Sequence, residues 1–165
     1  MKIAVTDANI FIDLIEIKLL DLLFLLGLEI HTTQAVYDQM NEEQKVLAEK
    51  YVTAQTLIVK SFDSKEILAI AELKFPAGLE IADRTVFYYS STIQATVLSG
   101  DKKLRVFCES KKIEVRGILW LFDNFVSQKL ITKASAVDKL QKLLAINNRL
   151  PLEECEKRIA KWSSE

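Results

Sequence analysis

Short continuous apolar runs alternate along this chain with longer stretches in which apolar residues recur at helical spacing. Residues 2–6 form the first run, which ends in polar residues, as expected of a strand covered on both faces. From Asn9 the apolar positions follow helical spacing, and Gly27 ends the apolar helical region. The same patterns predict further strands at residues 28–32, 56–62, 95–99 and 113–115.

Helical stretches separate these predicted strands. They cover residues 33–50, 63–73, 80–93, 101–111 and 117–129, and two more amphipathic helices, at residues 135–146 and 152–162, end the chain. Strands separated by helices of about ten or more residues pair in parallel, with helices on both faces of the sheet. The predicted fold class is therefore α/β.

Length and composition fit one folded domain. The chain has 165 residues, of which 50% are hydrophobic and 27% are charged, as in folded globular domains and unlike disordered ones. The chain has 22 lysines and arginines and 23 acidic residues, so its net charge is close to zero. It therefore has no overall positive field that would attract nucleic acid or an anionic membrane. Any polyanion must therefore be held by a local patch or by metal ions.

The most apolar part of the chain, residues 14–30, is too interrupted by charge to cross a membrane. Its longest uncharged piece spans only residues 22–28, against the roughly 20 residues that a bilayer requires. Asp7 also lies where a secretory signal would need its hydrophobic region, so we expect a cytoplasmic protein. Cys108 and Cys155 are far apart, and His31 is the single histidine, which favours buried free thiols over a zinc site or a disulfide framework.

Acidic residues occur at the connections where a predicted strand ends and a predicted helix begins. Asp7 follows the first strand and Asp101 follows the strand at residues 95–99, while Asp83 lies in the first turn of the helix that begins near residue 80. Ligands of parallel α/β sheets bind beyond the carboxyl ends of the strands, so these acids belong to one edge. Another helix carries Asp38 and Gln39 close to its first turns.

Each acid alone is explained by helix capping or by the helix dipole. Three acids that converge on one edge are not, because two carboxylates about 4 Å apart repel by roughly 4 kcal/mol at an effective dielectric near 20. A divalent cation removes this repulsion, and oxygen ligands select hard ions such as Mg²⁺. The natural chemistry of such a site is phosphodiester hydrolysis. His31 has no serine or cysteine at a plausible nucleophile turn, and a glycine-rich phosphate loop is missing.

Three segments together resemble a known family. VTDANIFIDL near the start, GLEIADRTVFYYS in the middle and VLSGDKKLRVFCESKKIEVRGILWLFDNFVSQKLI near the end resemble, in order and spacing, the PIN domain, and particularly its VapC-like toxin branch. The resemblance implies a three-layer α/β/α PIN-like domain over residues 1–131, with a mostly parallel sheet. Residues 132–165 would then form a helical C-terminal extension packed on the same domain.

The resemblance also implies an activity and its residues. It implies an endoribonuclease dependent on Mg²⁺ or Mn²⁺, the toxin of a toxin–antitoxin pair, in which Asp7, Asp83 and Asp101 take the catalytic, metal-binding positions. Asn9 and Ser99 match polar positions that help to hold the metal ligands. The implied partners are RNA, an antitoxin protein and a second copy of the chain in a homodimer.

The chain departs from the family pattern at one helix. The family usually has an acid in the segment that reads VYDQM here, and the closest alignment places Gln39 there, with Asp38 adjacent. Glu80, at the cap position before Asp83, is a possible substitute ligand. The alternative function is therefore a catalytically weakened PIN-fold module that binds RNA or protein.

Basic and aromatic residues give weaker signals. Lys102, Lys103 and Arg105 follow Asp101 and are candidate RNA contacts, although a solvated helix face explains them equally well. The aromatic residues of the helix at 117–129 are expected in the core or at a subunit interface and not as a base-stacking platform: Trp120, Phe122 and Phe125.

Overall fold

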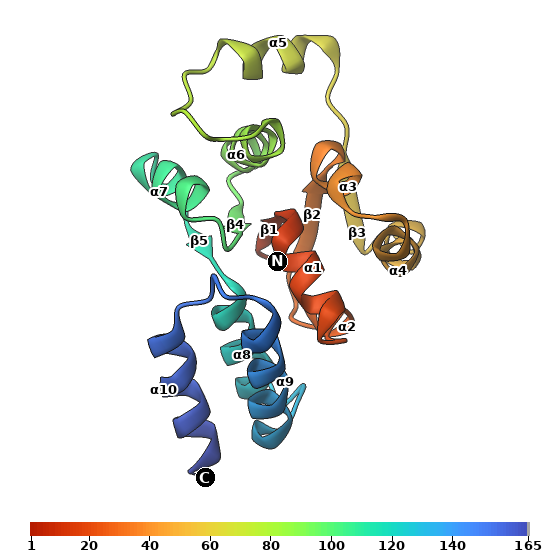
Figure 1. The fold of residues 1–165 in the computed structure, drawn as a ribbon. Coiled ribbons are helices and arrows are strands. Elements are labelled where there is room, and N and C mark those ends of the chain that lie inside the picture. Colours follow the sequence, from red (N-terminus) through yellow and green to blue (C-terminus); the bar gives the residue numbers. More distant parts are fainter. Residues whose placement is uncertain (165) are drawn as a thin grey trace.

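A five-stranded sheet forms the centre of the protein in the computed structural model, which describes residues 1–164 (Figure 1). The strand order is β3-β2-β1-β4-β5, and every neighbouring pair is parallel. The strands are β1 (Ile3–Thr6), β2 (Glu29–Thr33), β3 (Leu57–Lys60), β4 (Thr96–Leu98) and β5 (Val115–Arg116). This arrangement confirms the predicted α/β class with a parallel sheet.

The described residues form ten helices. They are α1 (Ala8–Glu16), α2 (Leu20–Leu23), α3 (Gln34–Gln39), α4 (Glu42–Thr53), α5 (Ser64–Glu72), α6 (Ile81–Ile93), α7 (Lys102–Ser110), α8 (Ile118–Ser127), α9 (Lys133–Ile146) and α10 (Leu152–Ser163). None of these helices is long and apolar enough to cross a membrane.

Two predicted helical stretches are broken where the backbone leaves helical geometry. Lys18 has a φ of 59° and separates α1 from α2. Met40 is extended between α3 and α4, and Asn41 starts α4 with a side chain that accepts the Gln44 N–H at 2.8 Å. Capping chemistry thus divides the predicted helix at residues 33–50 into two.

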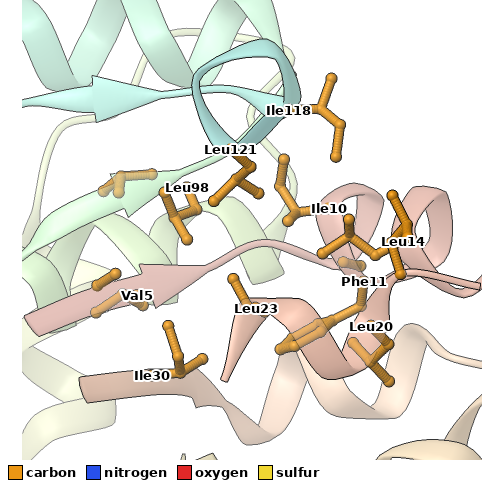
Figure 2. Close-up of a cluster of buried hydrophobic side chains, with 14 of the residues drawn as sticks. Val5, Ile10, Phe11, Leu14, Leu20, Leu23, Ile30, Leu98, Ile118 and Leu121 are labelled. Carbon is orange, nitrogen blue, oxygen red and sulfur yellow. The ribbon is translucent and has the colours of Figure 1, made fainter. Parts of the chain in front are cut away.

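The two faces of the sheet are covered differently. On one face α6 packs over the central strands, and His31 Nδ1 lies 2.6 Å from the Tyr89 hydroxyl. Ile30 alternates with His31 and therefore faces the other side. Figure 2 shows Ile30 and Leu98 there, together with apolar side chains of α1 and α8. These side chains are buried, so β1 and β4 are fixed at the middle of the core.

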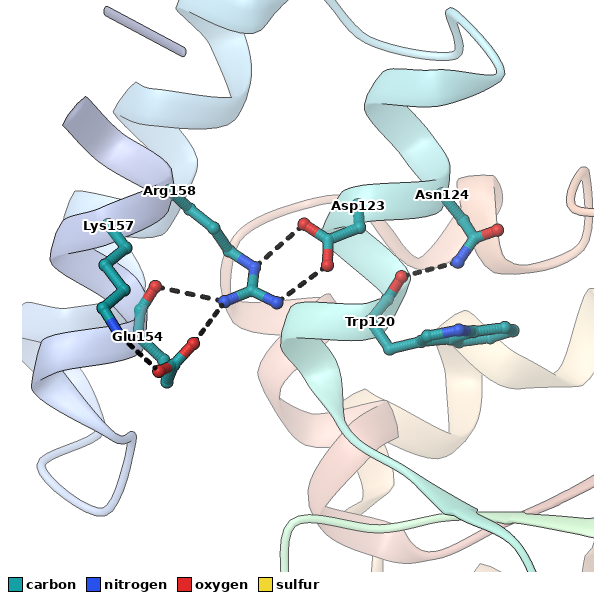
Figure 3. A network of polar contacts seen from close by, with 6 residues as sticks. All are labelled: Trp120, Asp123, Asn124, Glu154, Lys157 and Arg158. Carbon is teal, nitrogen blue, oxygen red and sulfur yellow. Dashed lines mark hydrogen bonds and ion pairs between the residues drawn. The ribbon is translucent and has the colours of Figure 1, made fainter. Parts of the chain in front are cut away.

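The C-terminal helices share this core. Their buried side chains belong to the same hydrophobic cluster as those of α8, and the Trp162 ring stacks on Phe122 with centroids 6.3 Å apart. The Arg158 guanidinium donates two hydrogen bonds of 2.8 Å to the Asp123 carboxylate (Figure 3). The division into residues 1–131 and 132–165 stays a prediction. Cys155 of α10 is buried and free, as is Cys108, in agreement with the expectation of buried thiols.

A half-buried polar contact joins the extension to α1. Asn147 Nδ2 donates to both carboxylate oxygens of Asp13, at 3.2 and 3.1 Å. Burial raises the pKa of Asp13 from 3.8 to about 6, although the hydrogen bond from Asn147 and the charge of Arg149 lower it and the charge of Glu16 raises it. The folded state therefore binds this proton more tightly than the unfolded chain does.

Acidification should consequently stabilise the wild type relative to Asp13→Asn. The carboxylate is ionised and partly desolvated at pH 7, and its folded-state penalty is removed as the pH falls through about 6 toward 3.8. Allowing for solvent screening, we expect a relative gain of about 1–2 kcal/mol in the free energy of unfolding. Urea titrations of both proteins between these pH values measure it, and a difference independent of pH would contradict the assignment to Asp13.

Candidate active site

Asp7 lies at the carboxyl end of β1, where the strand hands over to α1. Its Oδ1 atom accepts the Ala8 N–H at 2.8 Å, and its Oδ2 atom accepts the Ser99 hydroxyl at 2.8 Å. The Asp7 N–H donates to the Leu98 carbonyl, which ties this turn to β4. Only 5% of Asp7 is exposed, so its carboxylate is held in one orientation at the edge of the sheet.

Asp101 follows β4, the neighbour of β1. Its Oδ1 atom caps α7 by accepting the Leu104 N–H at 2.8 Å, and its own N–H donates to the Ser99 hydroxyl oxygen at 3.0 Å. Asn9 Oδ1 accepts the Gly100 N–H at 3.2 Å. Ser99 therefore contacts both acids, and Asn9 ties the turn after β1 to the turn after β4.

Asp83 comes to the same edge from α6. Its Oδ2 atom accepts the Glu80 N–H at 3.0 Å, so Asp83 is the residue that satisfies the backbone at the start of this helix. Glu80 occupies the cap position, as the sequence indicates, and its side chain stays exposed. The residue that favours the start of a helix here is therefore Asp83, three positions after the cap, and not Glu80 itself.

The acids at this edge oppose one another's ionisation. Burial raises the pKa of Asp83 to about 6; the hydrogen bond from Glu80 lowers it, and the charges of Asp7, Asp101 and Glu80 raise it. Burial also raises the pKa of Asp7, against its hydrogen bonds from Ser99 and the backbone, and the charges of Asp101 and Glu80 add to the increase. The structure therefore brings together four carboxylates that experience one another's field.

Gln39 and Asp38 lie differently with respect to these acids. Gln39 Nε2 donates to Glu80 Oε2 at 3.4 Å, whereas Asp38 Oδ1 accepts from Gln34 Nε2 at 2.8 Å along its own helix. Both residues are exposed. The contacts place Gln39 on the side of α3 that faces the acids and engage Asp38 elsewhere.

The chemistry of this donor set fits a hard divalent cation, but its geometry is not a closed metal site. Within residues 1–164, no three His, Cys, Asp or Glu side chains are grouped closely enough to hold an ion. Both Asp7 oxygens accept hydrogen bonds, as does one oxygen each of Asp83 and Asp101. The neighbouring charges that raise the pKa values of Asp7 and Asp83 are all carboxylates.

Comparison with known families agrees with this architecture. A family model described as a PIN domain matches residues 3–164. This chain belongs to the PIN domain family. PIN domains are generally nucleases and typically use divalent metal ions. An edge lined by carboxylates can bind such ions and support hydrolysis of a phosphodiester. A search of curated proteins found no match.

The acids of this PIN domain define a test for Gln39. Gln39→Glu should raise the affinity for Mn²⁺ roughly tenfold, because it adds a charged oxygen beside Glu80. Asp38→Asn, the matched control on the same helix, should leave the affinity unchanged. Isothermal titration with Mn²⁺ compares both variants. Loss of binding in Asp38→Asn would mean that α3 turns Asp38 inward instead, and no change in either would remove both residues from the site.

The three candidate RNA contacts on α7 of the PIN domain separate into two groups. Lys102 and Arg105 line a cavity of about 1030 Å³ that also includes Asn9 and Asp101. Lys103 lies instead over Gly78, where its Nζ atom is 2.7 Å from the position that a Cβ would occupy. Successive helical residues point about 100° apart, so this division follows from helix geometry.

The same cavity contains residues that sequence reasoning did not connect with the site. Asn147 to Pro151, between α9 and α10, form one side of it, and Trp120 of α8 lines it as well. In the sequence, the first group is only a polar connection between two amphipathic helices. Its position in one cavity with Asp101 depends on how the extension packs, for which the chain gives no local signal.

Proposed function

We propose that this PIN-domain protein is an endoribonuclease that hydrolyses RNA phosphodiester bonds with Mg²⁺ or Mn²⁺. The observation that carries the proposal is the convergence of Asp7, Asp83 and Asp101 on the carboxyl edge of the sheet. Burial and mutual repulsion raise the pKa values of Asp7 and Asp83, and the neighbouring charges that contribute are those of other carboxylates. A divalent cation would offset this repulsion.

Asp7, Asp83 and Asp101 would hold the ion. When bound, it would supply a polarised water and charge neutralisation at the phosphate. The chain's own residues orient these acids: Ser99 fixes Asp7 relative to Asp101, and Asn9 holds the turn after β4. With a pKa of about 6, Asp83 is largely ionised at neutral pH and becomes protonated in mild acid, where it would be a poor ligand.

The proposal includes a biological role and partners. The ordered motifs around these acids resemble the VapC-like branch, which supports a toxin in a toxin–antitoxin pair, a protein antitoxin as its inhibitor and a homodimeric state. A small open reading frame beside the gene, encoding a partner that inhibits RNA cleavage, would be the most direct support.

A second candidate function is an RNA- or protein-binding PIN module with little or no catalysis. Two observations favour it. Gln39, which faces Glu80, stands where the family usually has an acid, and the described acids do not form a closed three-ligand site. Tight RNA binding without cleavage in the presence of metal would select this alternative.

The deciding experiment measures metal binding and RNA cleavage in the same preparation. Mn²⁺ at about 100 times its dissociation constant should add roughly 2.7 kcal/mol of stability, which corresponds to an increase of about 5–10 °C in the unfolding temperature. Single-stranded RNA should be cut with Mn²⁺ or Mg²⁺ and remain intact in EDTA.

Asp101→Asn is the matched variant, because asparagine can still cap α7 while offering the metal no charge. It should lose most of the stabilisation by Mn²⁺ and the cleavage. An unchanged unfolding temperature of the wild type in millimolar Mn²⁺ would contradict the metal site, and equal cleavage by Asp101→Asn would point to a contaminating nuclease.

A further inference from the structure

The cavity of about 1030 Å³ lies between the acidic edge and the C-terminal extension. Its lining comes from α1, from the starts of α7 and α8, and from the connection between α9 and α10. In Figure 1 this connection reaches up to the segment that follows β5. The volume is comparable with that of the largest small-ligand sites. We call this space the extension cleft.

The charges of the extension cleft are balanced. Its cations are Lys102, Arg105 and Arg149, and its acids are Asp13, Glu16 and Asp101. A cleft with equal numbers of each sign has no net attraction for a run of phosphates. It does offer donors and acceptors between apolar walls, which is the lining that fixes the orientation of a small polar ring system.

Trp120 gives the cleft an aromatic surface. Phe122 and Phe125 of the same helix are fully buried in the core, whereas Trp120 is half-buried and packs against the edge of the core. A subunit interface at Trp120 stays a prediction. Trp120 lies two positions before Phe122 and therefore on a different side of α8, where it lines the cleft and also a neighbouring pocket that includes Asp123. The Arg116 guanidinium lies 5.9 Å from the centroid of its ring.

Arg105 is held beside this surface. Its Nη1 atom donates to the Val115 carbonyl at 3.0 Å and to Glu109 at 3.3 Å. The Nη2 atom lies 3.4 Å from where a Cβ at Gly117 would stand, so the missing side chain leaves room for the guanidinium. Arg149 is exposed and lines the same cleft from the extension, where its charge lowers the pKa of Asp13.

We propose that the extension cleft binds one unstacked base of single-stranded RNA, next to the phosphate that is cleaved. Trp120 provides the stacking surface, and Arg149 contributes a contact from the extension. The class of ligand rests on the proposed function; the position rests on Asn9 and Asp101, which belong to both the cleft and the acidic edge. Proteins that bind single-stranded RNA commonly stack splayed bases on aromatic rings or guanidinium planes and contact their edges with polar groups.

RNA affinity tests this proposal without requiring catalysis. A short fluorescein-labelled single-stranded RNA of mixed sequence is titrated with the full chain in EDTA, and its anisotropy gives the dissociation constant. Trp120→Leu should weaken binding roughly tenfold and Arg149→Ala several-fold. Trp120→Phe keeps an aromatic ring and should therefore retain most of the wild-type affinity. Lys142→Ala, which removes an exposed cation of α9 outside the cleft, should bind as the wild type does.

An oligonucleotide of the same length without bases separates base contacts from phosphate contacts. The wild type should bind it about as weakly as Trp120→Leu binds the complete RNA, and Trp120→Leu should lose little further affinity. Equal effects of Trp120→Leu on both oligonucleotides would overturn base binding in the cleft.

The two tryptophans supply an independent spectroscopic measurement. Trp162 is 4% exposed in the core, so RNA should quench the fluorescence of Trp162→Phe, which retains Trp120, and leave that of Trp120→Phe unchanged. Quenching that persists in Trp120→Phe would overturn the proposal. So would wild-type affinity in both Trp120→Leu and Arg149→Ala. RNA binding through Trp120 without metal-dependent cleavage would instead contradict the nuclease function and leave the cleft assignment standing.

Discussion

Asp7→Asn should lower the rate of metal-dependent RNA cleavage at least about a hundredfold while leaving the fold intact. Asparagine keeps the shape of the side chain and can still accept the Ala8 N–H that starts α1. The Ser99 hydroxyl can accept from the new amide in place of donating to a carboxylate. What is lost is the negative charge that a cation would need.

The stability of this variant separates catalysis from folding. Burial raises the pKa of Asp7, so its carboxylate is held at some energetic cost, and its neutral replacement should unfold at the same or a higher temperature. Cleavage is followed on labelled RNA with Mn²⁺, and folding by circular dichroism.

A matched control is available at another helix start. Asp63 caps α5 by accepting the Glu66 N–H at 2.8 Å, and Asp63→Asn should retain full activity. If Asp7→Asn cleaves as fast as this control, Asp7 is a capping residue and not a metal ligand.

Removal of residues 132–165 should prevent residues 1–131 from folding as a stable monomer. The cut removes five side chains that are at most 4% exposed, and it uncovers the apolar surface of α8 beneath them: Ala136, Leu140, Leu143, Cys155 and Trp162. Loss of one large buried apolar side chain costs about 2–5 kcal/mol, while a whole domain is stable by about 5–15 kcal/mol. The truncated chain should therefore aggregate or lack a cooperative unfolding transition.

Single substitutions in the full chain test the same contribution of the extension to stability. Leu140→Ala should lower the free energy of unfolding by about 2–5 kcal/mol, and Lys142→Ala, exposed two positions later, by less than about 0.5 kcal/mol. Circular dichroism and gel filtration compare all three proteins. A monomeric fragment 1–131 with a sharp transition would show that the extension is an appendage and would support the division at residue 131.

Local patterns were enough to predict most elements of this fold. The strand predicted at residues 95–99 is β4 (Thr96–Leu98), and the helix expected after Asp101 is α7, because capping and apolar periodicity act over a few residues. The breaks at Lys18 and Met40 were missed: one depends on a positive φ at a residue that gives no such signal, and the other on the capping choice of Asn41.

Part of the candidate site could also be predicted from local patterns, and part of it depends on tertiary packing. Strand ends could be located, so the gathering of Asp7, Asp83 and Asp101 at one edge followed from parallel topology. The orientation of Gln39 toward Glu80 needed a contact between α3 and the start of α6. The extension cleft, which Trp120 lines, depends on the packing of α9 and α10, which neither periodicity nor spacing predicts.

The bond between Asp7 and Ser99 joins positions 92 residues apart in the chain. During synthesis, β1 and β2 can pair early, but β4 must emerge from the ribosome before it can take its place on the other side of β1. Contacts of such long sequence separation form late, because the loop that joins them must close first. A growing chain therefore carries Asp7 long before Ser99 and Asp101 are available to complete the acidic edge.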